Sequence, residues 1–500
     1  MVPSFDQVAE SISHADTPAE AVGIVYGDVG SLSLRCTVTG HLAKNEYVQI
    51  HHEICGYVLG QVDDIQRKTD LSIERAQQMS KGHDIEIEEK VIAVVSIIGF
   101  RDDRDLLQVP HTPFRAGEAV YRATEDLICE IIGLNKDERK GAYLGMLSGH
   151  DVPILVDINS LVQRHVSILA KTGGGKSYAA GVLIEEFMKH DVTTVIIDPH
   201  GEYTSMKTPA EHSDSMKRFD VSPKSYRGKI MEYSPDTKVN PDARPLRFTL
   251  KNLDAREIIG LTNLKSVRAN LLSLRRALDI LKSGGKDYDL ADIIAILDSE
   301  DDPSNSSLIN ELEYLKEVEI FAREGTKIDD LISKGGTSIM NLKGAAPDIQ
   351  ELIVNRLATA LFELRKLDKI PPLMLVMEEA HNFCPQQGTA ASSKILRTIA
   401  SEGRKFGLGL LVLSQRAAKI DKNVLSQCNT QIILKLTNPN DLKAVVASVE
   451  GLTSGMTDEI QRLPIGVALV VGGNITSPLF VEVRPRESEH GGQSIKVIEG

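Results

Sequence analysis

Residues 170–177 have the sequence "AKTGGGKS" and follow the apolar run "HVSILA". This spacing fits a phosphate-binding loop, because consecutive glycines let backbone N–H groups converge on a phosphate chain. Lys176 is placed to reach the β- and γ-phosphate oxygens, and Ser177 is placed to ligate Mg²⁺. The sequence therefore predicts a site for ATP and Mg²⁺. The predicted nucleotide-binding residues are Gly173, Gly174, Gly175, Lys176, Ser177 and Tyr178.

Two further strand ends supply the carboxylates that phosphoryl transfer needs. The strand-like "LMLVMEEAH" ends in Glu378, predicted to hold Mg²⁺ through water, and in Glu379, predicted to polarise an attacking water. The strand-like "VTTVIIDPHGEY" ends in Asp198. Asp198 and Glu378 are both candidates for the Mg²⁺ role, and spacing does not choose between them. For residues 200–202, a turn fixed by its own hydrogen bonds explains the sequence at least as well as direct catalysis.

Three more side chains are candidates because of where they stand relative to predicted strands. Gln415 ends the strand "GLGLLVLS" and is predicted to sense the γ-phosphate, since sheets of this class bind ligands at strand ends. Arg164 precedes the phosphate-loop strand, so we expect it to act on the site of a neighbouring chain. Arg404, in "SEGRKFGLGL", is predicted to contact the nucleotide of its own chain. From spacing alone, a surface salt bridge explains either arginine equally well.

From residue 165 onward, strands and helices alternate, which predicts an α/β fold with a parallel sheet covered by helices on both faces. The predicted strands are 165–170, 193–198, 372–378, 408–414 and 430–436, and the predicted phosphate-loop helix is 176–190. Residues 254–335 carry apolar side chains at helical spacing instead. We therefore expect a helical insertion within the α/β domain.

The chain before residue 105 has a different pattern of short alternating stretches separated by glycines, which predicts a small β-barrel. A charged interval, "QRKTDLSIERAQQMSKGHD", interrupts it as a helix or solvated loop. The predicted domains are a barrel at 1–105, an ATPase core at 106–485 with the insertion 254–335, and a tail at 486–500.

Composition narrows the class of protein. The 500 residues hold five scattered cysteines without a C-x-x-C pair, so neither a disulfide framework nor a zinc knuckle is indicated. The net charge of −13 argues against a general polyanion-coating protein, although it does not exclude a local basic channel. No apolar run approaches the roughly 20 residues that span a bilayer, and the N-terminus lacks a basic leader. We expect a cytoplasmic protein that has no membrane segment.

In order along the chain, "LAKTGGGKS", "VIIDPHGEY", "LMLVMEEAHNF" and "SEGRKFGLGLLVLSQR" closely resemble HerA, the DNA translocase family of the HerA/FtsK superfamily. The likeness covers nearly the whole chain. It implies a hexameric ring of RecA-like ATPase domains, each behind an N-terminal barrel of the HAS type. It also implies double-stranded DNA as the substrate, a NurA-type nuclease on the barrel face, and a role in DNA-end resection and double-strand-break repair. By the same resemblance, Arg164 matches the family's trans arginine and Arg404 its cis arginine.

The DNA contacts are open to more than one interpretation. Lys394 and Arg397 follow a Gly/Ser/Ala-rich loop and could track a phosphate backbone, but a solvated helix face explains them equally well. A second candidate is the basic helix around Arg268, Arg275, Arg276 and Lys282. The absence of Trp favours contact with a duplex backbone over base stacking.

Two other functions fit the same motifs. One is an ATPase motor of the conjugation or secretion type, which moves protein instead of DNA. The other is a scaffold protein that uses a nucleotide as a slow switch. The Glu379 carboxylate argues against the switch, because a pure switch needs no positioned base.

Overall fold

The chain divides into two compact units in the computed structural model. The barrel unit comprises Met1–Leu134, Gly149–Val152 and Ile475–Ser477, and the α/β unit comprises the remainder of the chain. The structure describes residues 20–134, 139–262, 264, 267–285, 287–300, 302–449, 452, 454–473 and 475–492. The N-terminal residues 1–19, in which we expect no leader, and residues 493–500 of the predicted tail lie outside the described residues.

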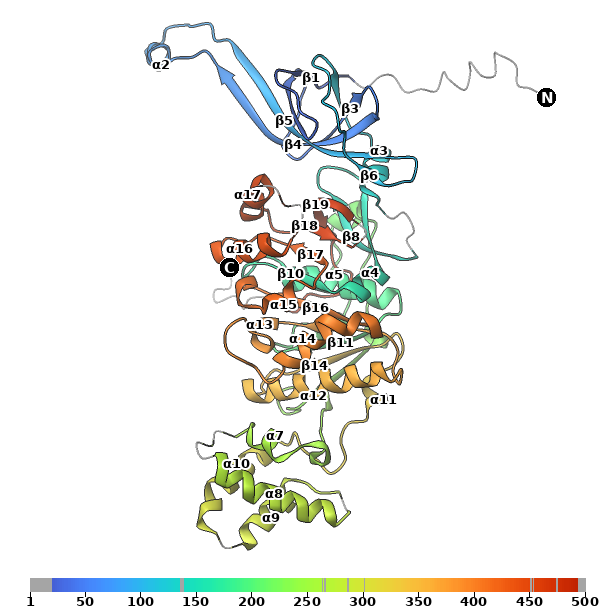
Figure 1. Ribbon diagram of the computed structural model, residues 1–500, viewed down its shortest axis with the longest axis vertical. Coiled ribbons are helices and arrows are strands. Elements are labelled where there is room, and N and C mark those ends of the chain that lie inside the picture. Colours follow the sequence, from blue (N-terminus) through green and yellow to red (C-terminus); the bar gives the residue numbers. More distant parts are fainter. Residues whose placement is uncertain are drawn as a thin grey trace, which may run out of the picture. The chain divides into compact units, whose positions relative to one another are not determined.

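The barrel unit contains a closed β-barrel of six antiparallel strands in the order β2-β1-β7-β3-β4-β5, with β5 pairing back to β2 (Figure 1). Val25, Ile50 and Val95 are among the fully buried residues that fill its interior. The predicted small barrel is thus confirmed. The strands are β1 (Gly23–Tyr26), β2 (Ser33–Val38), β3 (Tyr47–His52), β4 (Gly56–Thr69), β5 (Glu89–Arg101) and β7 (Ala119–Arg122), and the short β6 (Leu107–Gln108) pairs with the end of β5.

Strand β7 lies beyond residue 105, where we predicted the barrel to end. It pairs with β1 on one side and with β3 on the other, so the barrel does not close without it. A strand of four residues is too short to show a clear alternation in the sequence. Helix α3 (Glu125–Ile132) follows it and also belongs to the barrel unit, burying Ile128, Ile131 and Ile132.

The charged interval of the sequence forms the end of a long hairpin. Strands β4 and β5 remain paired as far as Thr69 and Glu89, and helix α2 (Ile73–Ser80) lies at the tip (Figure 1). The Ser72 side chain accepts a hydrogen bond from the Arg75 amide and so caps the helix. None of the residues of α2 is buried, so the helical alternative that we gave for this interval fits the structure.

The α/β unit is built on a twelve-stranded sheet in the order β13-β12-β14-β11-β15-β16-β10-β17-β18-β19-β8-β9. The strands from β13 to β17 pair in parallel, and β17 to β18, β19 to β8 and β8 to β9 pair antiparallel. This confirms the predicted α/β class. The strands are β8 (Gly141–Leu147), β9 (Pro153–Asp157), β10 (Val166–Leu169), β11 (Thr193–Asp198), β12 (Ile230–Ser234), β13 (Arg244–Pro245), β14 (Thr337–Asn341), β15 (Leu373–Met377), β16 (Leu408–Ser414), β17 (Thr430–Ile433), β18 (Val467–Gly472) and β19 (Ile475–Val483).

The central parallel strands bring the sequence motifs to one edge of the sheet. Every residue of β10, β11, β15 and β16 is buried, as expected of strands covered on both faces. Their register pairs Leu169 with Ser414 and Ile197 with Met377. The carboxyl ends of these strands therefore meet at the edge where the segments containing Lys176, Glu378 and Gln415 begin.

Helices flank the sheet and also form the insertion. Helices α7 to α11 lie between β13 and β14, and buried side chains of α7 to α10 belong to the same apolar cluster as those of the sheet. Among the described helices, none is long and apolar enough to cross a membrane. The helices are α4 (Ile158–Arg164), α5 (Lys176–Lys189), α6 (Ser215–Arg218), α7 (Ala255–Ile259), α8 (Val267–Ser283), α9 (Leu290–Ser299), α10 (Ser306–Glu317), α11 (Ile328–Leu331), α12 (Pro347–Lys366), α13 (Ala380–Phe383), α14 (Ser393–Glu402), α15 (Lys422–Leu425), α16 (Pro439–Ser448) and α17 (Ser454–Arg462).

The segment after β19 packs into the α/β unit instead of leaving it. Arg484 and Ser488 are fully buried, and Arg486 is 2% exposed. The prediction of a tail from residue 486 does not fit these residues. Because these side chains are polar, the sequence shows no apolar pattern from which their burial could be predicted. Ion pairs with α5 offset the free-energy cost of burying their charges.

Candidate nucleotide-binding and hydrolysis site

A cavity of about 680 Å³ lies where the phosphate loop leaves the sheet. Five of the six predicted nucleotide-binding residues line the cavity. The sixth, Gly174, is buried and is not part of the cavity lining. A Cβ atom at Gly174 would come within 2.9 Å of the Lys171 carbonyl oxygen, so this position has no room for a side chain. The five lining residues are Gly173, Gly175, Lys176, Ser177 and Tyr178.

The backbone of the loop has the form that a phosphate cradle requires. Gly173 and Gly175 have φ angles of +70° and +92°, in the left-handed region that favours glycine. Helix α5 begins directly afterwards, and its first N–H groups and dipole favour an anion there. The Ser177 side chain lines the same cavity. The loop therefore fits ATP, and its hydroxyl fits Mg²⁺.

Lys176 lies between the two predicted carboxylates. Its Nζ atom forms an ion pair with Glu378 and lies 3.3 Å from Glu379 Oε1. All three side chains are almost completely buried. Burial lowers the pKa of Lys176, and the charge of Glu379 opposes that shift. The structure thus brings these three predicted residues together, and a bound phosphate chain would compete with the carboxylates for the ammonium group.

Glu379 has a strained backbone and one unused oxygen. Its φ and ψ angles are 48° and 46°, a left-handed conformation that non-glycine residues rarely adopt and that is frequent at functional sites. Gln415 Nε2 donates a hydrogen bond to Glu379 Oε1 at 2.6 Å, and Thr172 Oγ1 donates one to Gln415 Oε1 at 2.5 Å. Among the described residues, the buried Oε2 atom of Glu379 accepts no hydrogen bond, although the His381 Nδ1 atom lies 3.3 Å from it. That oxygen is available to accept a proton from water.

Asp198 and Glu378, the two candidates for Mg²⁺, have different surroundings. Asp198 is fully buried and accepts backbone hydrogen bonds from Gly201 at 2.8 Å and from Tyr203 at 3.0 Å. Burial raises the pKa of Asp198, and the backbone hydrogen bonds oppose the shift. Its carboxylate therefore folds the loop at residues 199–203. The Tyr203 hydroxyl in turn donates to Glu378 Oε2 at 2.6 Å.

We expect Glu378 and not Asp198 to hold Mg²⁺, because the Asp198 carboxylate is occupied by the backbone amides of its own loop. No group of three or more His, Cys, Asp and Glu side chains among the described residues is arranged to hold a metal. Mg²⁺ at nucleotide sites keeps several waters and needs only one or two protein ligands besides the phosphates, so Ser177 and Glu378 suffice. For residues 200–202, the hydrogen bonds to Asp198 support the interpretation as a turn.

Arg164 lies before the amino end of β10, whereas the phosphate loop follows its carboxyl end, and hydrogen bonds of the neighbouring His165 hold the backbone there. It ends α4, and its side chain is exposed. The next residue, His165, is buried; its Nδ1 accepts from the Leu410 amide at 2.9 Å, and its Nε2 lies 3.0 Å from the Ala400 carbonyl oxygen. Strand β10 (Val166–Leu169) separates Arg164 from the phosphate loop and is about 13 Å long at about 3.3 Å per residue. Arg164 therefore lies before the amino end of β10, at the edge of the sheet opposite its own phosphate loop, and its action on a neighbouring chain stays a prediction.

Arg404 and Arg164 both lie at the edge of the sheet where the amino ends of the parallel strands meet. It precedes β16 in a 3₁₀ turn at Gly403–Phe406 and is exposed, whereas Gln415 follows the other end of β16. Because β10 and β16 run parallel, the amino ends of both strands face away from the phosphate loop. The predicted contact of Arg404 with the nucleotide of its own chain does not fit this position. Order along the chain could not show that a whole strand separates Arg404 from the site.

The two predicted DNA-contacting residues, Lys394 and Arg397, differ in their surroundings. Both lie on α14 and are exposed, but Arg397 Nε pairs with Asp421 Oδ2 at 2.7 Å. The Asp421 carboxylate is nearly buried and also caps α15, so Arg397 has a structural role. In the alternative basic helix, α8, Arg275 and Arg276 are exposed.

Three residues of the site were not predicted from the sequence. They are Thr172 and Tyr203, whose hydrogen bonds are given above, and His381. The His381 Nδ1 atom lies 3.0 Å from the Ser414 hydroxyl and 3.3 Å from Glu379 Oε2. Burial lowers the pKa of His381, and Glu379 opposes that shift. The sequence "EEAH" places His381 two residues after Glu379, and that spacing is the signal that could have identified it.

Comparisons with known proteins agree with this geometry. Residues 142–361 match the family model described as "Helicase HerA, central domain". The "DNA double-strand break repair helicase HerA" of Pyrococcus furiosus is 27% identical over 96% of both chains. The "Probable DNA double-strand break repair helicase HerA" of Methanocaldococcus jannaschii is 30% identical over 82% of this chain and 88% of that protein. Among solved structures, VirB4 of Thermoanaerobacter pseudethanolicus aligns with 70% of this chain and 97% of its own at 17% identity and a TM-score of 0.49.

Three observations lead to one assignment: the sequence motifs, an α/β fold that follows a closed barrel along the chain, and the similarity over most of the chain to relatives of this name. The chain belongs to the HerA family.

Proposed function

We propose that the chain is an ATP-driven motor that moves along double-stranded DNA and acts in the repair of double-strand breaks. One observation carries the enzymatic part of this proposal: Lys176, which lines the cavity of the phosphate loop, forms ion pairs with both Glu378 and Glu379. The DNA part is supported by family membership, because the relatives from P. furiosus and M. jannaschii are named as DNA double-strand break repair helicases.

In this mechanism, Lys176 leaves the carboxylates and binds the phosphate chain when ATP enters the loop. Mg²⁺, held by Ser177 and through water by Glu378, would neutralise charge on the phosphates. Glu379 Oε2 accepts a proton from the attacking water, while Gln415 orients Glu379 through its bond to Oε1. Thr172 joins the loop to Gln415, so loss of the γ-phosphate would be transmitted to Gln415 and the end of β16.

The site needs a second chain to be complete. The whole length of β10 separates Arg164 from its own phosphate loop. In a ring, which the family resemblance predicts to be hexameric, it would enter the site of the neighbour and stabilise charge on the transferring phosphoryl group. Arg404 lies on the same edge of the sheet and would approach the same neighbouring site. Hydrolysis would then depend on assembly.

The remaining expectations concern partners. Lys394, which is exposed on α14, is the better of the two predicted candidates for contact with the DNA backbone, because Arg397 is held by Asp421. A nuclease of the NurA type, bound to the barrel, would resect the DNA end that the motor delivers. Both remain predictions from the resemblance and the sequence.

ATP turnover with and without linear duplex DNA tests this function. We expect turnover to rise several-fold when duplex is added and the rise to weaken as salt is increased, because contacts to phosphates release counterions. The assay uses the unsubstituted protein, and single-stranded DNA of the same length is the control ligand. Turnover that is equal with and without any DNA would contradict the proposal and would favour a motor for another substrate.

A further inference from the structure

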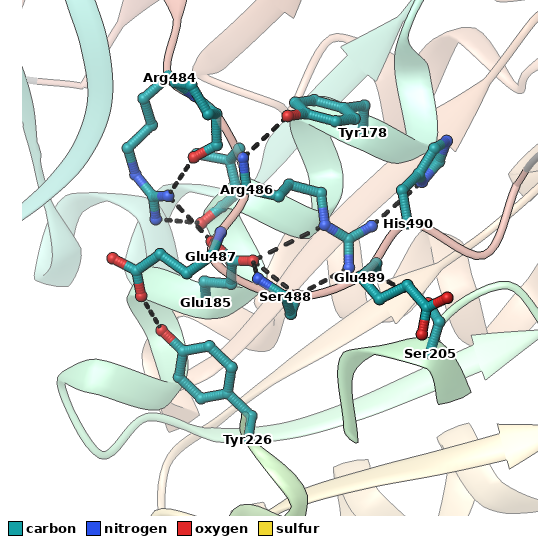
Figure 2. A network of polar contacts seen from close by, with 12 residues as sticks. Tyr178, Glu185, Ser205, Tyr226, Arg484, Arg486, Glu487, Ser488, Glu489 and His490 are labelled. Atoms are coloured by element: carbon teal, nitrogen blue, oxygen red, sulfur yellow. Dashed lines mark hydrogen bonds and ion pairs between the residues drawn. The ribbon is translucent and has the colours of Figure 1, made fainter. Parts of the chain in front are cut away.

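Residues 484–492, which follow β19 and which we call the C-terminal strap, are fixed to the phosphate-loop helix by a buried ionic network (Figure 2). Arg484 Nη1 pairs with Glu185 Oε2 at 2.9 Å, and Nη2 pairs with Glu186 Oε1 at 2.7 Å. The Ser488 amide donates to Glu185 Oε1 at 2.9 Å. Both glutamates are on α5, so the strap and the phosphate loop are attached to the same helix.

Arg486 lies in the strap and contacts two aromatic side chains, one through its backbone N–H and one through its guanidinium group. Its backbone N–H donates to the Tyr178 hydroxyl at 2.9 Å, and its Nη1 atom lies 3.2 Å from His490 Nδ1 (Figure 2). Its Nη2 atom also donates to Ser488 Oγ at 2.9 Å. A Cβ atom at position 181 would come within 2.6 Å of the Arg486 guanidinium carbon, so Gly181 leaves the space that this side chain occupies. One buried residue thus holds both rings.

The two rings form part of the cavity wall beyond the phosphate loop. The ring centroids of Tyr178 and His490 are 5.4 Å apart at 76°, and both residues line the nucleotide cavity. Phe219, Ile465 and Pro485 add apolar surface to the same wall. An apolar wall with a few polar groups is typical of small-molecule sites, and here it adjoins the phosphate cradle.

The state of the His490 ring follows from its neighbours. A guanidinium group only donates hydrogen bonds, so Nδ1 of His490 is the acceptor of the contact with Arg486. Burial, and then the charge of Arg486, lower the pKa of His490. The ring is therefore neutral near neutral pH, with its proton on Nε2. It offers a flat face and one N–H donor.

We propose that the C-terminal strap forms the subsite for the base and ribose of the nucleotide. His490 and Tyr178 contact that part of the ligand, and Arg486 is the positioning residue that holds both rings. The phosphate loop supplies no group that recognises a base, so the strap decides how well a nucleotide is distinguished from bare polyphosphate. This inference rests on the proposed function only in that the cavity binds a nucleotide.

Binding of two ligands to the full chain tests the subsite. A non-hydrolysable ATP analogue carries base, ribose and phosphates, whereas inorganic tripolyphosphate carries phosphates alone. We expect His490→Ala to weaken binding of the analogue roughly tenfold, the loss of one aromatic contact with a base. Binding of tripolyphosphate should not change. His83→Ala is the matched control, because His83 is exposed in the barrel unit and far along the sequence from the strap.

A double-mutant cycle tests the positioning role of Arg486. Arg486→Lys keeps the charge but loses the fork that reaches both Ser488 and His490. It should weaken binding of the ATP analogue in the wild-type background and have little further effect when His490 is already alanine. His490→Asn, which keeps an acceptor for Arg486 but has no ring, should behave as His490→Ala does if the ring contacts the base.

The outcomes separate this inference from the proposed function. Unchanged affinity of His490→Ala for the ATP analogue overturns the subsite while leaving the proposed function intact. Equal weakening of both ligands also overturns it, because the strap would then act only on the fold of the phosphate loop. Failure of the unsubstituted chain to bind either ligand overturns the proposed function and the subsite together.

Discussion

Replacement of Glu379 by glutamine is expected to lower the rate of ATP hydrolysis by about 10²- to 10⁴-fold, the usual contribution of a general base. The amide keeps the shape of the side chain and retains an oxygen at the contact with Gln415, but it cannot accept the proton of the attacking water. Affinity for ATP should remain or increase, because one carboxylate beside Lys176 loses its charge and no longer competes with the phosphates. Steady-state turnover and equilibrium binding of ATP measure the two effects.

Glu324→Gln is the matched control for this variant. It makes the same chemical change at an exposed residue of the α/β unit and should leave turnover unchanged. If Glu379→Gln hydrolysed ATP at the wild-type rate, Glu379 would not be the base, and the strained conformation of its backbone would need another explanation.

Mixing two inactive variants is expected to restore part of the ATPase activity. Arg164→Ala alone should lose about 10³- to 10⁵-fold, the range for an arginine finger, and Lys176→Ala should lose activity because it cannot hold the phosphates. In a mixed ring, an Arg164→Ala chain keeps its own loop and can receive Arg164 from a Lys176→Ala neighbour. That interface has every group that hydrolysis requires.

The mixture is measured against each variant alone at the same total concentration. A mixture that stays as inactive as its components would contradict a trans role and would place Arg164 in the site of its own chain. Since Arg404 lies on the same edge of the sheet, Arg404→Ala mixed with Lys176→Ala should also regain activity. Restored activity would show that Arg404 acts on a neighbouring chain, as its position in the structure suggests, and not on the nucleotide of its own chain, as the resemblance implied.

The central site could be predicted from the sequence because its parts lie at strand ends. A glycine loop after an apolar strand, two glutamates after another and a glutamine after a third must meet at one edge of a parallel sheet. The hydrogen bond between Gln415 and Glu379 follows from that rule. The rule does not tell which of Asp198 and Glu378 holds Mg²⁺. That preference depends on the backbone amides of residues 201 and 203, which donate hydrogen bonds to Asp198.

Other features depend on contacts between segments far apart along the chain. Arg404 lies only ten positions before Ser414 along the chain, yet β16 (Leu408–Ser414) runs between them, so Arg404 lies near the opposite edge of the sheet. Residues 486–492 of the strap fall in the segment that we predicted to be a C-terminal tail. Arg484 and Arg486 are buried only because Glu185 and Glu186, about 300 positions earlier, face them from α5.

Movement along duplex DNA is the central claim, and displacement of a third strand tests it most directly. A short oligonucleotide bound as a triplex near one end of a linear duplex should be released when the protein and ATP are added. Release should fail with a non-hydrolysable analogue and with Glu379→Gln, since both leave nucleotide binding intact while blocking hydrolysis. If the third strand stays bound while the protein hydrolyses ATP, the account is contradicted, because ATP hydrolysis would then drive something other than translocation on DNA.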